Sequence, residues 1–332
     1  MSVKTKRVTL ALFLSVFLIF STTILAHAYS SILSFGDSLS DNGYYQGYAG
    51  GTPGNTNPAD IYGFRRYSNG PVWVEYLAGP TNFNVPLLDL AYGGATSGWD
   101  NPAASKATGN PIYDTTRGLQ WQVAAYQSVY LTIAPTTLVT LWAGGNDMFQ
   151  FFSPDTVQAG LNRAAGLYNP DKAAQNIGLA IQNLITIGGR EFIVPNLAYT
   201  DLDPLKIWKE PFDNSLSLVL AALIGANPEV DIYPLDMNDL VLTGIDHYDG
   251  TWKGHYMPYP TPGGAPEGAP DMGAGTYRWW DTVGVHPTTE VHVQIAAYAA
   301  VATEVPEPTT MLLLGSGLIG LLGYGRKKFL KK

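Results

Sequence analysis

Short apolar segments of β type alternate with segments of helical periodicity along the middle of this 332-residue chain. A strand, a helix and a further strand predict a parallel sheet, because the helix returns the chain to the starting end of the sheet. Helices cover both faces of such sheets, so their strands are apolar throughout. We therefore expect an α/β fold with a parallel sheet over residues 29–304. The predicted strands are residues 31–35, 87–92, 137–142, 192–194 and 231–235.

Helices are expected between these strands and after the last one. They cover residues 71–78, 115–133, 171–187, 214–224 and 287–303. Two segments rich in Gly, Pro and Tyr, 44–69 and 253–275, interrupt the pattern. Loops of this length in a compact domain are usually functional, so they are expected either to wall a substrate cleft or to be surface loops.

Charge and cysteine content exclude several classes of function. The sequence has no cysteine, which excludes a disulfide scaffold, a thiolate zinc site and a cysteine nucleophile. Of the 19 Lys and Arg residues, eight lie at the two ends of the chain, whereas 26 of the 27 acidic residues lie in residues 29–304. The central region is therefore strongly negative, which argues against nucleic acid as a partner.

The N-terminus has the pattern of a secretory signal peptide, predicted as residues 1–28. A basic start precedes an apolar run over residues 8–25, and the small residues Ala26 and Ala28 flank His27 as a cleavage site. An uncleaved membrane anchor is the alternative. The signal peptide predicts export.

The C-terminus, residues 305–332, has three parts in order: Val-Pro-Glu-Pro, an apolar segment over residues 309–325, and a basic tail. The apolar segment has the minimum length for crossing a bilayer, and its basic end should stay cytoplasmic. This tail resembles the PEP-CTERM sorting signal of Gram-negative bacteria. The resemblance implies processing by an exosortase-type enzyme and an inner-membrane helix before processing. It also implies a location in the periplasm, at the cell surface or in the extracellular matrix. An ordinary C-terminal anchor is the alternative.

Four candidate site residues lie at strand ends or before the last helix. Ser38 follows the first predicted strand in the string Gly-Asp-Ser-Leu-Ser-Asp, and Gly94 follows the second. Asn146 follows the third in Gly-Gly-Asn-Asp, and His286 precedes the final helix. Because the carboxyl ends of parallel strands share one edge, these residues can converge. A serine, a base and neutral donors for an oxyanion are what a hydrolytic serine needs.

The ordered set resembles the GDSL (SGNH) esterase and lipase family over nearly the whole central region. The resemblance implies a flavodoxin-like three-layer α/β/α sandwich, the SGNH hydrolase fold. It implies that Ser38 is the nucleophile and, through its own N–H, an oxyanion donor. Gly94 and Asn146 match the other two donors, with Gly93 as the alternative to Gly94. His286 matches the general base.

The position of the triad acid departs from the family pattern. The family usually places this acid three residues before the histidine, where the present chain has Val283. The nearest acid, Asp281, lies five residues before His286, and we expect it to serve if the intervening residues bulge. A backbone carbonyl or another acid could orient His286 instead; the other candidates are Asp246, Asp249 and Asp271.

The remaining polar residues near these motifs are expected to have structural roles. Asp37 and Asp147 should form caps and hydrogen bonds around the site. His292 lies within the last helix and is expected to be structural, and His247 and His255 are expected to be loop histidines. No rigid ligand spacing supports a metal, and no motif indicates a cofactor.

These observations predict a secreted serine hydrolase that cleaves carboxylic esters through an acyl-serine intermediate. The substrate is expected to be a small-molecule, lipid or glycan ester. A deacetylase of extracellular polysaccharide is the alternative enzyme. A non-catalytic glycan-binding or matrix module is the alternative from another class, supported only by the unusual position of Asp281.

Overall fold

The computed structural model describes residues 29–43, 66–68, 70–197, 203–239, 286–287 and 289–303. Contacts divide the chain into one unit of residues 28–300 and a second unit formed by residues 1–27 and 301–332. The predicted signal peptide and the predicted tail lie outside the described residues. Within the described ranges, no helix combines the length and the apolar character that crossing a membrane requires.

Five parallel strands form one sheet in the order β2-β1-β3-β4-β5. The longest register joins β1 and β3, from the pair Ser31 and Thr137 to the pair Gly36 and Trp142. The strands are β1 (Ser31–Gly36), β2 (Leu87–Asp89), β3 (Thr137–Trp142), β4 (Glu191–Pro195) and β5 (Asp231–Leu235). All five predicted strands are therefore confirmed, although β2 ends three residues early.

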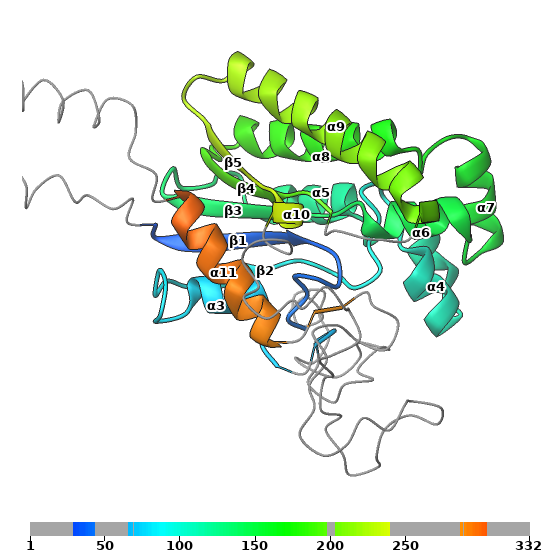
Figure 1. Ribbon diagram of the computed structural model, residues 1–332, viewed down its shortest axis with the longest axis horizontal. Coiled ribbons are helices and arrows are strands. Elements are labelled where there is room, and N and C mark those ends of the chain that lie inside the picture. The colour runs from blue at the N-terminus through cyan, green and yellow to red at the C-terminus, as the bar shows by residue number, and fades with distance from the viewer. Residues whose placement is uncertain are drawn as a thin grey trace, which may run out of the picture. The chain divides into compact units, whose positions relative to one another are not determined.

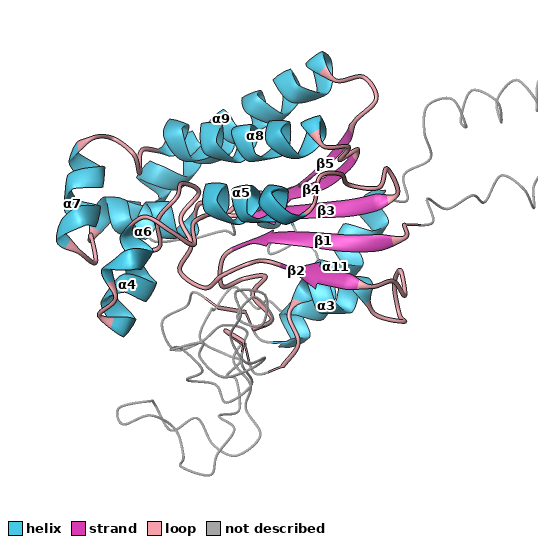
Figure 2. Cartoon of the chain, turned by 180° about the vertical axis from the view of Figure 1, so that it is seen from behind, coloured by secondary structure: helices cyan, strands magenta, loops and turns pink. Residues whose placement is uncertain are grey.

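Helices cover both faces of the sheet (Figures 1 and 2). The face that carries α3 and α11 lies opposite the face that carries α5, α8 and α9, which confirms the three-layer α/β/α arrangement. The short helices α4 and α6 lie beyond the carboxyl ends of the strands (Figure 2). The helices are α3 (Trp73–Ala78), α4 (Pro102–Thr108), α5 (Leu119–Val129), α6 (Gly145–Phe152), α7 (Val157–Ala164), α8 (Pro170–Thr186), α9 (Asp203–Ala226), α10 (Met237–Asp239) and α11 (Thr289–Thr303), with a 3₁₀ turn over Pro111–Asp114.

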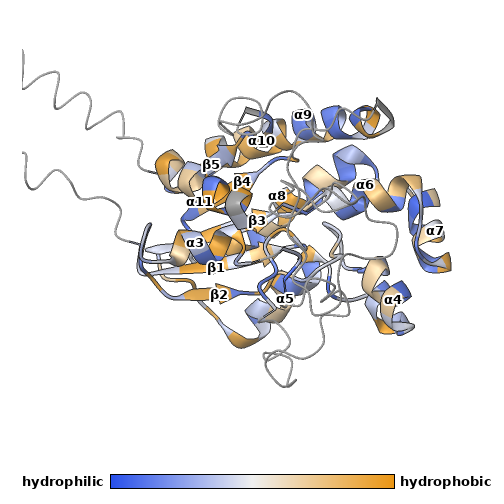
Figure 3. Ribbon diagram, turned by 60° about the horizontal axis from the view of Figure 1, so that its bottom comes forward, coloured by the Kyte–Doolittle hydropathy of each residue, from blue (hydrophilic) through white to orange (hydrophobic). Residues whose placement is uncertain are grey.

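Residues of the central strands pack against the helices on both faces of the sheet. Leu33 and Phe35 of β1 belong to the main core, which α5, α8 and α9 complete. On the other face, the buried Trp73 of α3 meets Trp142 of β3 edge to face, with ring centroids 5.8 Å apart. The helices combine hydrophobic and hydrophilic residues along their length, as helices on a sheet surface must (Figure 3). The sheet is thus buried on both sides, and this packing holds the carboxyl ends of its strands in position.

The helices differ from the prediction mainly around the strand ends. Helices α4, α6 and α7 were not predicted, because each has at most eight residues and too few turns to show a periodic pattern. Helix α9 begins at residue 203 rather than 214 and contains Pro211. Pro71 was expected in the first turn of α3, but this helix begins at Trp73. The Glu75 side chain stabilises that start, because it accepts the Val72 N–H at 2.9 Å.

Candidate active site

Ser38 lies in a single helical turn directly after β1. The Asp41 N–H donates to the Asp37 carbonyl at 3.0 Å and closes that turn. Gly36, with a φ of +151°, makes the turn possible, because a Cβ at this position would lie 2.3 Å from the Trp142 carbonyl oxygen. The close approach of β1 and β3 at Gly36 therefore determines the position of the turn that carries Ser38.

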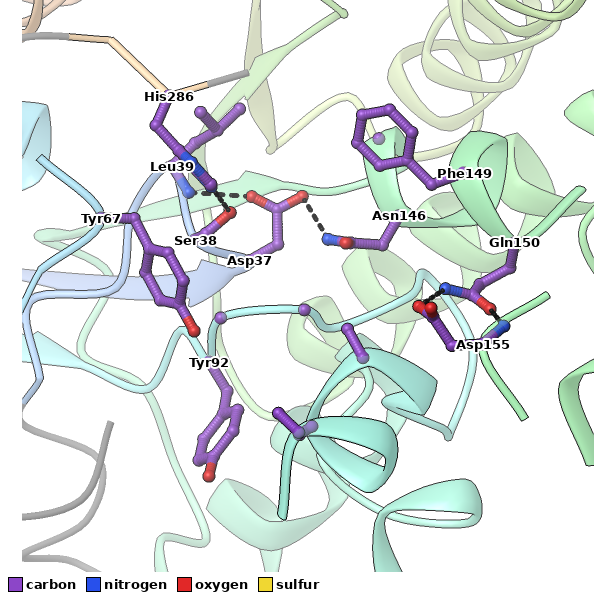
Figure 4. Close-up of a pocket in the computed structure, with 16 residues that line it drawn as sticks. Asp37, Ser38, Leu39, Tyr67, Tyr92, Asn146, Phe149, Gln150, Asp155 and His286 are labelled. Carbon is purple, nitrogen blue, oxygen red and sulfur yellow. Dashed lines mark hydrogen bonds between the residues drawn. The ribbon is translucent and has the colours of Figure 1, made fainter. Parts of the chain in front are cut away.

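His286 lies beside Ser38 although 248 residues separate them. Its Nε2 is 2.9 Å from the Ser38 Oγ, within hydrogen-bond distance (Figure 4). The segment that carries it is held to the region around α3, since the Ser68 hydroxyl donates to the Pro287 carbonyl at 2.9 Å. The Tyr67 ring packs against the imidazole, with centroids 5.0 Å apart. The structure thus brings the predicted nucleophile and base together.

Gly94 lines the same cavity as Ser38 and His286, and its backbone has a left-handed conformation. Its φ is +83°, and a Cβ there would lie 2.5 Å from the Asn101 Oδ1. The Gly93 N–H donates to the Asp41 Oδ2 at 2.7 Å, whereas the Gly94 N–H has no acceptor among the described residues. The geometry therefore favours Gly94 over the alternative Gly93 as an oxyanion donor.

Asn146 projects from the first turn of α6 toward Ser38. Its Nδ2 lies 3.4 Å from the Asp37 Oδ2, a long hydrogen bond that directs the amide into the cavity (Figure 4). An amide nitrogen carries two hydrogens, so one remains for a bound oxyanion. Ser38, Gly94, Asn146 and His286 all line one cavity of about 370 Å³.

Buried carboxyl groups tie the loops of the site together. Asp37 accepts the Leu39 N–H at 3.0 Å, and Asp147 accepts both the N–H and the hydroxyl of Ser97 at 2.7 Å. These are the capping and hydrogen-bonding roles expected for them. Burial raises the pKa of Asp37 to about 6 and that of Asp147 to about 7, against the opposing effect of these hydrogen bonds.

A second pair of carboxyl groups joins the loops that follow β1 and β2. Asp41 accepts the N–H groups of Gly43 and Gly93, both at 2.7 Å. Asp89 accepts the N–H groups of Asn42 at 3.0 Å and Ala91 at 3.1 Å. Burial raises the pKa of Asp41 to about 6, and burial together with Asp41 raises the pKa of Asp89 well above its ordinary value.

Asp41 was not predicted as a site residue from the sequence. It lies within the string that contains Ser38, but its partner Gly93 is 52 residues away. The available signal was an acid next to the nucleophile motif with no assigned role. Tyr67 and Phe149, which line the cavity, were missed because single aromatic residues carry no pattern.

Several predicted residues fall outside the described ranges. They are Asp281, its alternatives Asp246, Asp249 and Asp271, and the histidines His247 and His255. His292 lies within α11, fully buried, and burial lowers its pKa to about 3, as suits the structural role expected of it. In the part of the chain that the structure describes, no three His, Asp or Glu residues cluster as metal ligands would.

Comparison with known proteins identifies two parts of the chain. Residues 32–299 match the GDSL-like lipase/acylhydrolase family model, and residues 304–328 match the PEP-CTERM protein-sorting motif. The second match implies export to the envelope or surface of a Gram-negative cell. The chain is also 35% identical over 125 residues to a phosphatidylcholine-sterol acyltransferase of Aeromonas hydrophila, covering 37% of this chain and 34% of that protein. The chain thus spans about a third of the length of that curated relative.

The solved structures that match this chain share little sequence with it. One is an acetylxylan esterase from Geobacillus stearothermophilus, with 14% identity, a TM-score of 0.42, and coverage of 84% of this chain and 95% of that one. Another is an α/β hydrolase from the metagenome of Lake Arreo, with 15% identity, a TM-score of 0.46, and coverage of 82% and 94%. The family match, in contrast, spans well over half of the chain. The protein therefore belongs to the GDSL-like lipase and acylhydrolase family, a family of ester-cleaving hydrolases.

Proposed function

We propose that this protein is an exported serine esterase in which Ser38 is the nucleophile and His286 the general base. The hydrogen bond of 2.9 Å between the Ser38 Oγ and the His286 Nε2, at the wall of an open cavity, carries the proposal. A serine hydroxyl is a weak nucleophile until a base removes its proton. His286 is within reach to do so, and no other described residue is hydrogen-bonded to this hydroxyl.

Catalysis then proceeds in two steps. The Ser38 Oγ attacks the ester carbonyl carbon while its proton moves to His286. The bond from that carbon to the alcohol oxygen breaks, and His286 returns the proton to the departing alcohol. Water, deprotonated by His286, then attacks the acyl carbon. The bond from that carbon to the Ser38 Oγ breaks, Oγ takes the proton back from His286, and the acid is released. Each proton that His286 accepts is thus returned to a leaving oxygen.

The tetrahedral intermediate places a negative charge on the former carbonyl oxygen. We assign its stabilisation to the N–H groups of Ser38 and Gly94 and to the Asn146 amide. These neutral donors line the same cavity as the nucleophile. Loss of one such donor typically costs ~10²–10³ in kcat.

Asp281 remains our proposal for the acid that orients His286. A carboxylate on the second imidazole nitrogen holds the tautomer in which Nε2 accepts the serine proton. Asp281→Asn should therefore lower kcat by about 10⁴. Normal kcat in that variant would assign the role to another group.

We further propose that the chain is exported by a cleaved N-terminal signal and that the tail is processed by an exosortase-type enzyme. The match of residues 304–328 to a sorting motif supports this route. The apolar segment 309–325 would cross the inner membrane before processing. The test is the mass of the mature protein, which should lack both ends; a mature chain that retains residues 1–28 and 305–332 would contradict the route.

Hydrolysis of p-nitrophenyl esters from acetate to palmitate by the full chain tests the activity, with Ser38→Ala as the matched variant. Turnover that disappears in Ser38→Ala supports the serine mechanism. Equal turnover in the two proteins would refute it. An acetate-only profile would favour the deacetylase of extracellular polysaccharide. No turnover from the folded wild type would favour the binding module.

A further inference from the structure

One part of the cavity at Ser38 is lined by residues of α4 and α6. We call this part the α4–α6 groove. Its walls are apolar: three alanines of α4 on one side and Phe149 of α6 on the other. The alanines are Ala103, Ala104 and Ala107. Ala103 and Ala107 are one helical turn apart and therefore share a face of α4.

The reacting groups divide the cavity into two sides. His286 and Tyr67 lie on one side of Ser38, and Asn146 and Phe149 lie on the other (Figure 4). Gly94 is next to the groove as well, since a Cβ on it would lie 2.9 Å from the Ala103 Cβ. The groove therefore begins at the oxyanion donors and leads away from the base.

The chemistry assigns a part of the substrate to each side. His286 must protonate the alcohol oxygen as it leaves, so the alcohol has to lie on the His286 side. The acyl chain is bonded to the same carbonyl carbon and points away from the alcohol. It therefore enters the α4–α6 groove.

We propose that the α4–α6 groove binds the acyl chain and makes the enzyme selective for esters of short and medium-length fatty acids rather than acetates. This proposal rests on the serine esterase function above. An acetyl group has no carbon beyond its methyl and would leave the groove empty. The alanine methyls and the Phe149 ring offer apolar contact and no charge, which suits a hydrocarbon chain.

The far end of the groove is polar and sets the limit on chain length. The Gln150 Nε2 donates to the Asp155 Oδ2 at 2.6 Å, and the Asp155 N–H donates to the Gln150 Oε1 at 2.8 Å. Lys106 forms an ion pair with Asp155 at 2.7 Å. A hydrocarbon chain that reached this cluster would desolvate charged groups without replacing their hydrogen bonds. Acyl chains longer than the groove should therefore show no further increase in kcat/KM.

The first test is the dependence of kcat/KM on acyl length for a fixed p-nitrophenyl leaving group. Each methylene that leaves water raises kcat/KM about fourfold. Butanoate has two methylenes more than acetate, so we expect its kcat/KM to exceed that of acetate by about 15-fold, with a plateau before palmitate. A maximum at acetate, abolished in Ser38→Ala, would overturn the groove assignment and leave the esterase function intact. Turnover that persists in Ser38→Ala would instead overturn the proposed function.

The second test is Ala107→Asp, with Ala222→Asp as the matched control. Both alanines are exposed on helices, but Ala222 is on α9 and does not line the cavity. We expect Ala107→Asp to lower the octanoate-to-acetate ratio of kcat/KM by at least about tenfold, because a carboxylate excludes an apolar chain. Ala222→Asp should leave this ratio unchanged, and thermal unfolding checks that both variants fold. An unchanged ratio in Ala107→Asp would refute the proposal.

A third comparison separates the acyl chain from the alcohol. For butanoate esters with alcohols of increasing size, kcat/KM should change with alcohol size in the same way in wild type and in Ala107→Asp, because the alcohol lies on the His286 side. If Ala107→Asp instead discriminates by alcohol size, the groove binds the alcohol and the acyl assignment is wrong.

Discussion

From the contact between Asp41 and Gly93 we predict that a carboxylate that does not line the cavity controls the proposed oxyanion site. Asp41 holds two N–H groups at 2.7 Å with its two oxygens. Asp41→Asn preserves the shape but leaves one oxygen, so one of the two amides then faces an NH₂ group. If that amide is Gly93, the neighbouring Gly94 N–H shifts away from its position in the cavity.

The size of the effect follows from the bonds that are lost. A hydrogen bond to a charged group contributes about 1.5–3 kcal/mol, and a buried amide left without an acceptor costs about 1–3 kcal/mol. Burial raises the pKa of Asp41 to about 6, so the ionised carboxylate is itself costly to bury, and a neutral Asn recovers part of the loss. We expect a net loss of about 1–2 kcal/mol in unfolding free energy. A displaced donor should lower kcat by about 10–10², less than its complete removal.

The assay is kcat and KM for p-nitrophenyl butanoate at pH 8, together with the inhibition constant of an alkyl boronic acid. The tetrahedral boronate places an oxygen at the oxyanion position, so its affinity should fall together with kcat while KM changes less than threefold. Below pH 6 the wild-type Asp41 carboxyl group is protonated and therefore neutral, like the Asn side chain of the variant. The difference in kcat between wild type and variant should therefore narrow there.

Asp89→Asn is the matched control. Asp89 is equally buried between the same two loops but holds Asn42 and Ala91 rather than Gly93. It should lower stability by a similar amount and leave kcat within about threefold. Equal losses of kcat in the two variants would show that loop stability, and not the Gly93 contact, controls turnover.

Three further predictions concern single residues. Gly94→Ala should lower the unfolding free energy by about 2 kcal/mol or more, measured by urea denaturation, because its φ is +83° and a Cβ would meet Asn101. Asn146→Ala should lower kcat by ~10²–10³ with a small change in KM in steady-state assays. His292→Leu should reduce acid sensitivity. Burial lowers the pKa of His292 to about 3 against about 6.5 unfolded, so wild type loses stability as pH falls below 6.5. Between pH 8 and 5 the wild type should lose about 2 kcal/mol more than this variant by thermal or urea unfolding; an equal loss would refute this.

The sheet could be predicted because its signal is local. Each strand is a short apolar run bounded by Gly, Pro or polar residues, and parallel topology follows from the intervening helices. The convergence of Ser38, Gly94 and Asn146 follows from the same topology, since the carboxyl ends of neighbouring strands share an edge. The order β2-β1-β3 places the ends of these three strands side by side.

What the sequence could not predict depends on contacts between distant segments. Asp41 and Asp89 gain their roles only when the loops after β1 and β2 meet. The choice between Gly93 and Gly94 likewise needed the knowledge that Asp41 occupies the first N–H. Helices α4 and α6 form the groove walls, yet each is too short for a periodic signal. The side chains that we propose to set specificity are thus less visible in the sequence than those that we propose to carry the chemistry.

The separation of Ser38 from His286 has a consequence for the newly made chain. Ribosomes deliver Ser38, the proposed nucleophile, 248 residues before His286, the proposed base. Until the segment that carries His286 docks, this imidazole is not beside Ser38 to accept its proton. A nascent or truncated chain that ends before residue 286 therefore carries the serine but cannot activate it. We therefore expect hydrolytic activity only after His286 has docked beside Ser38.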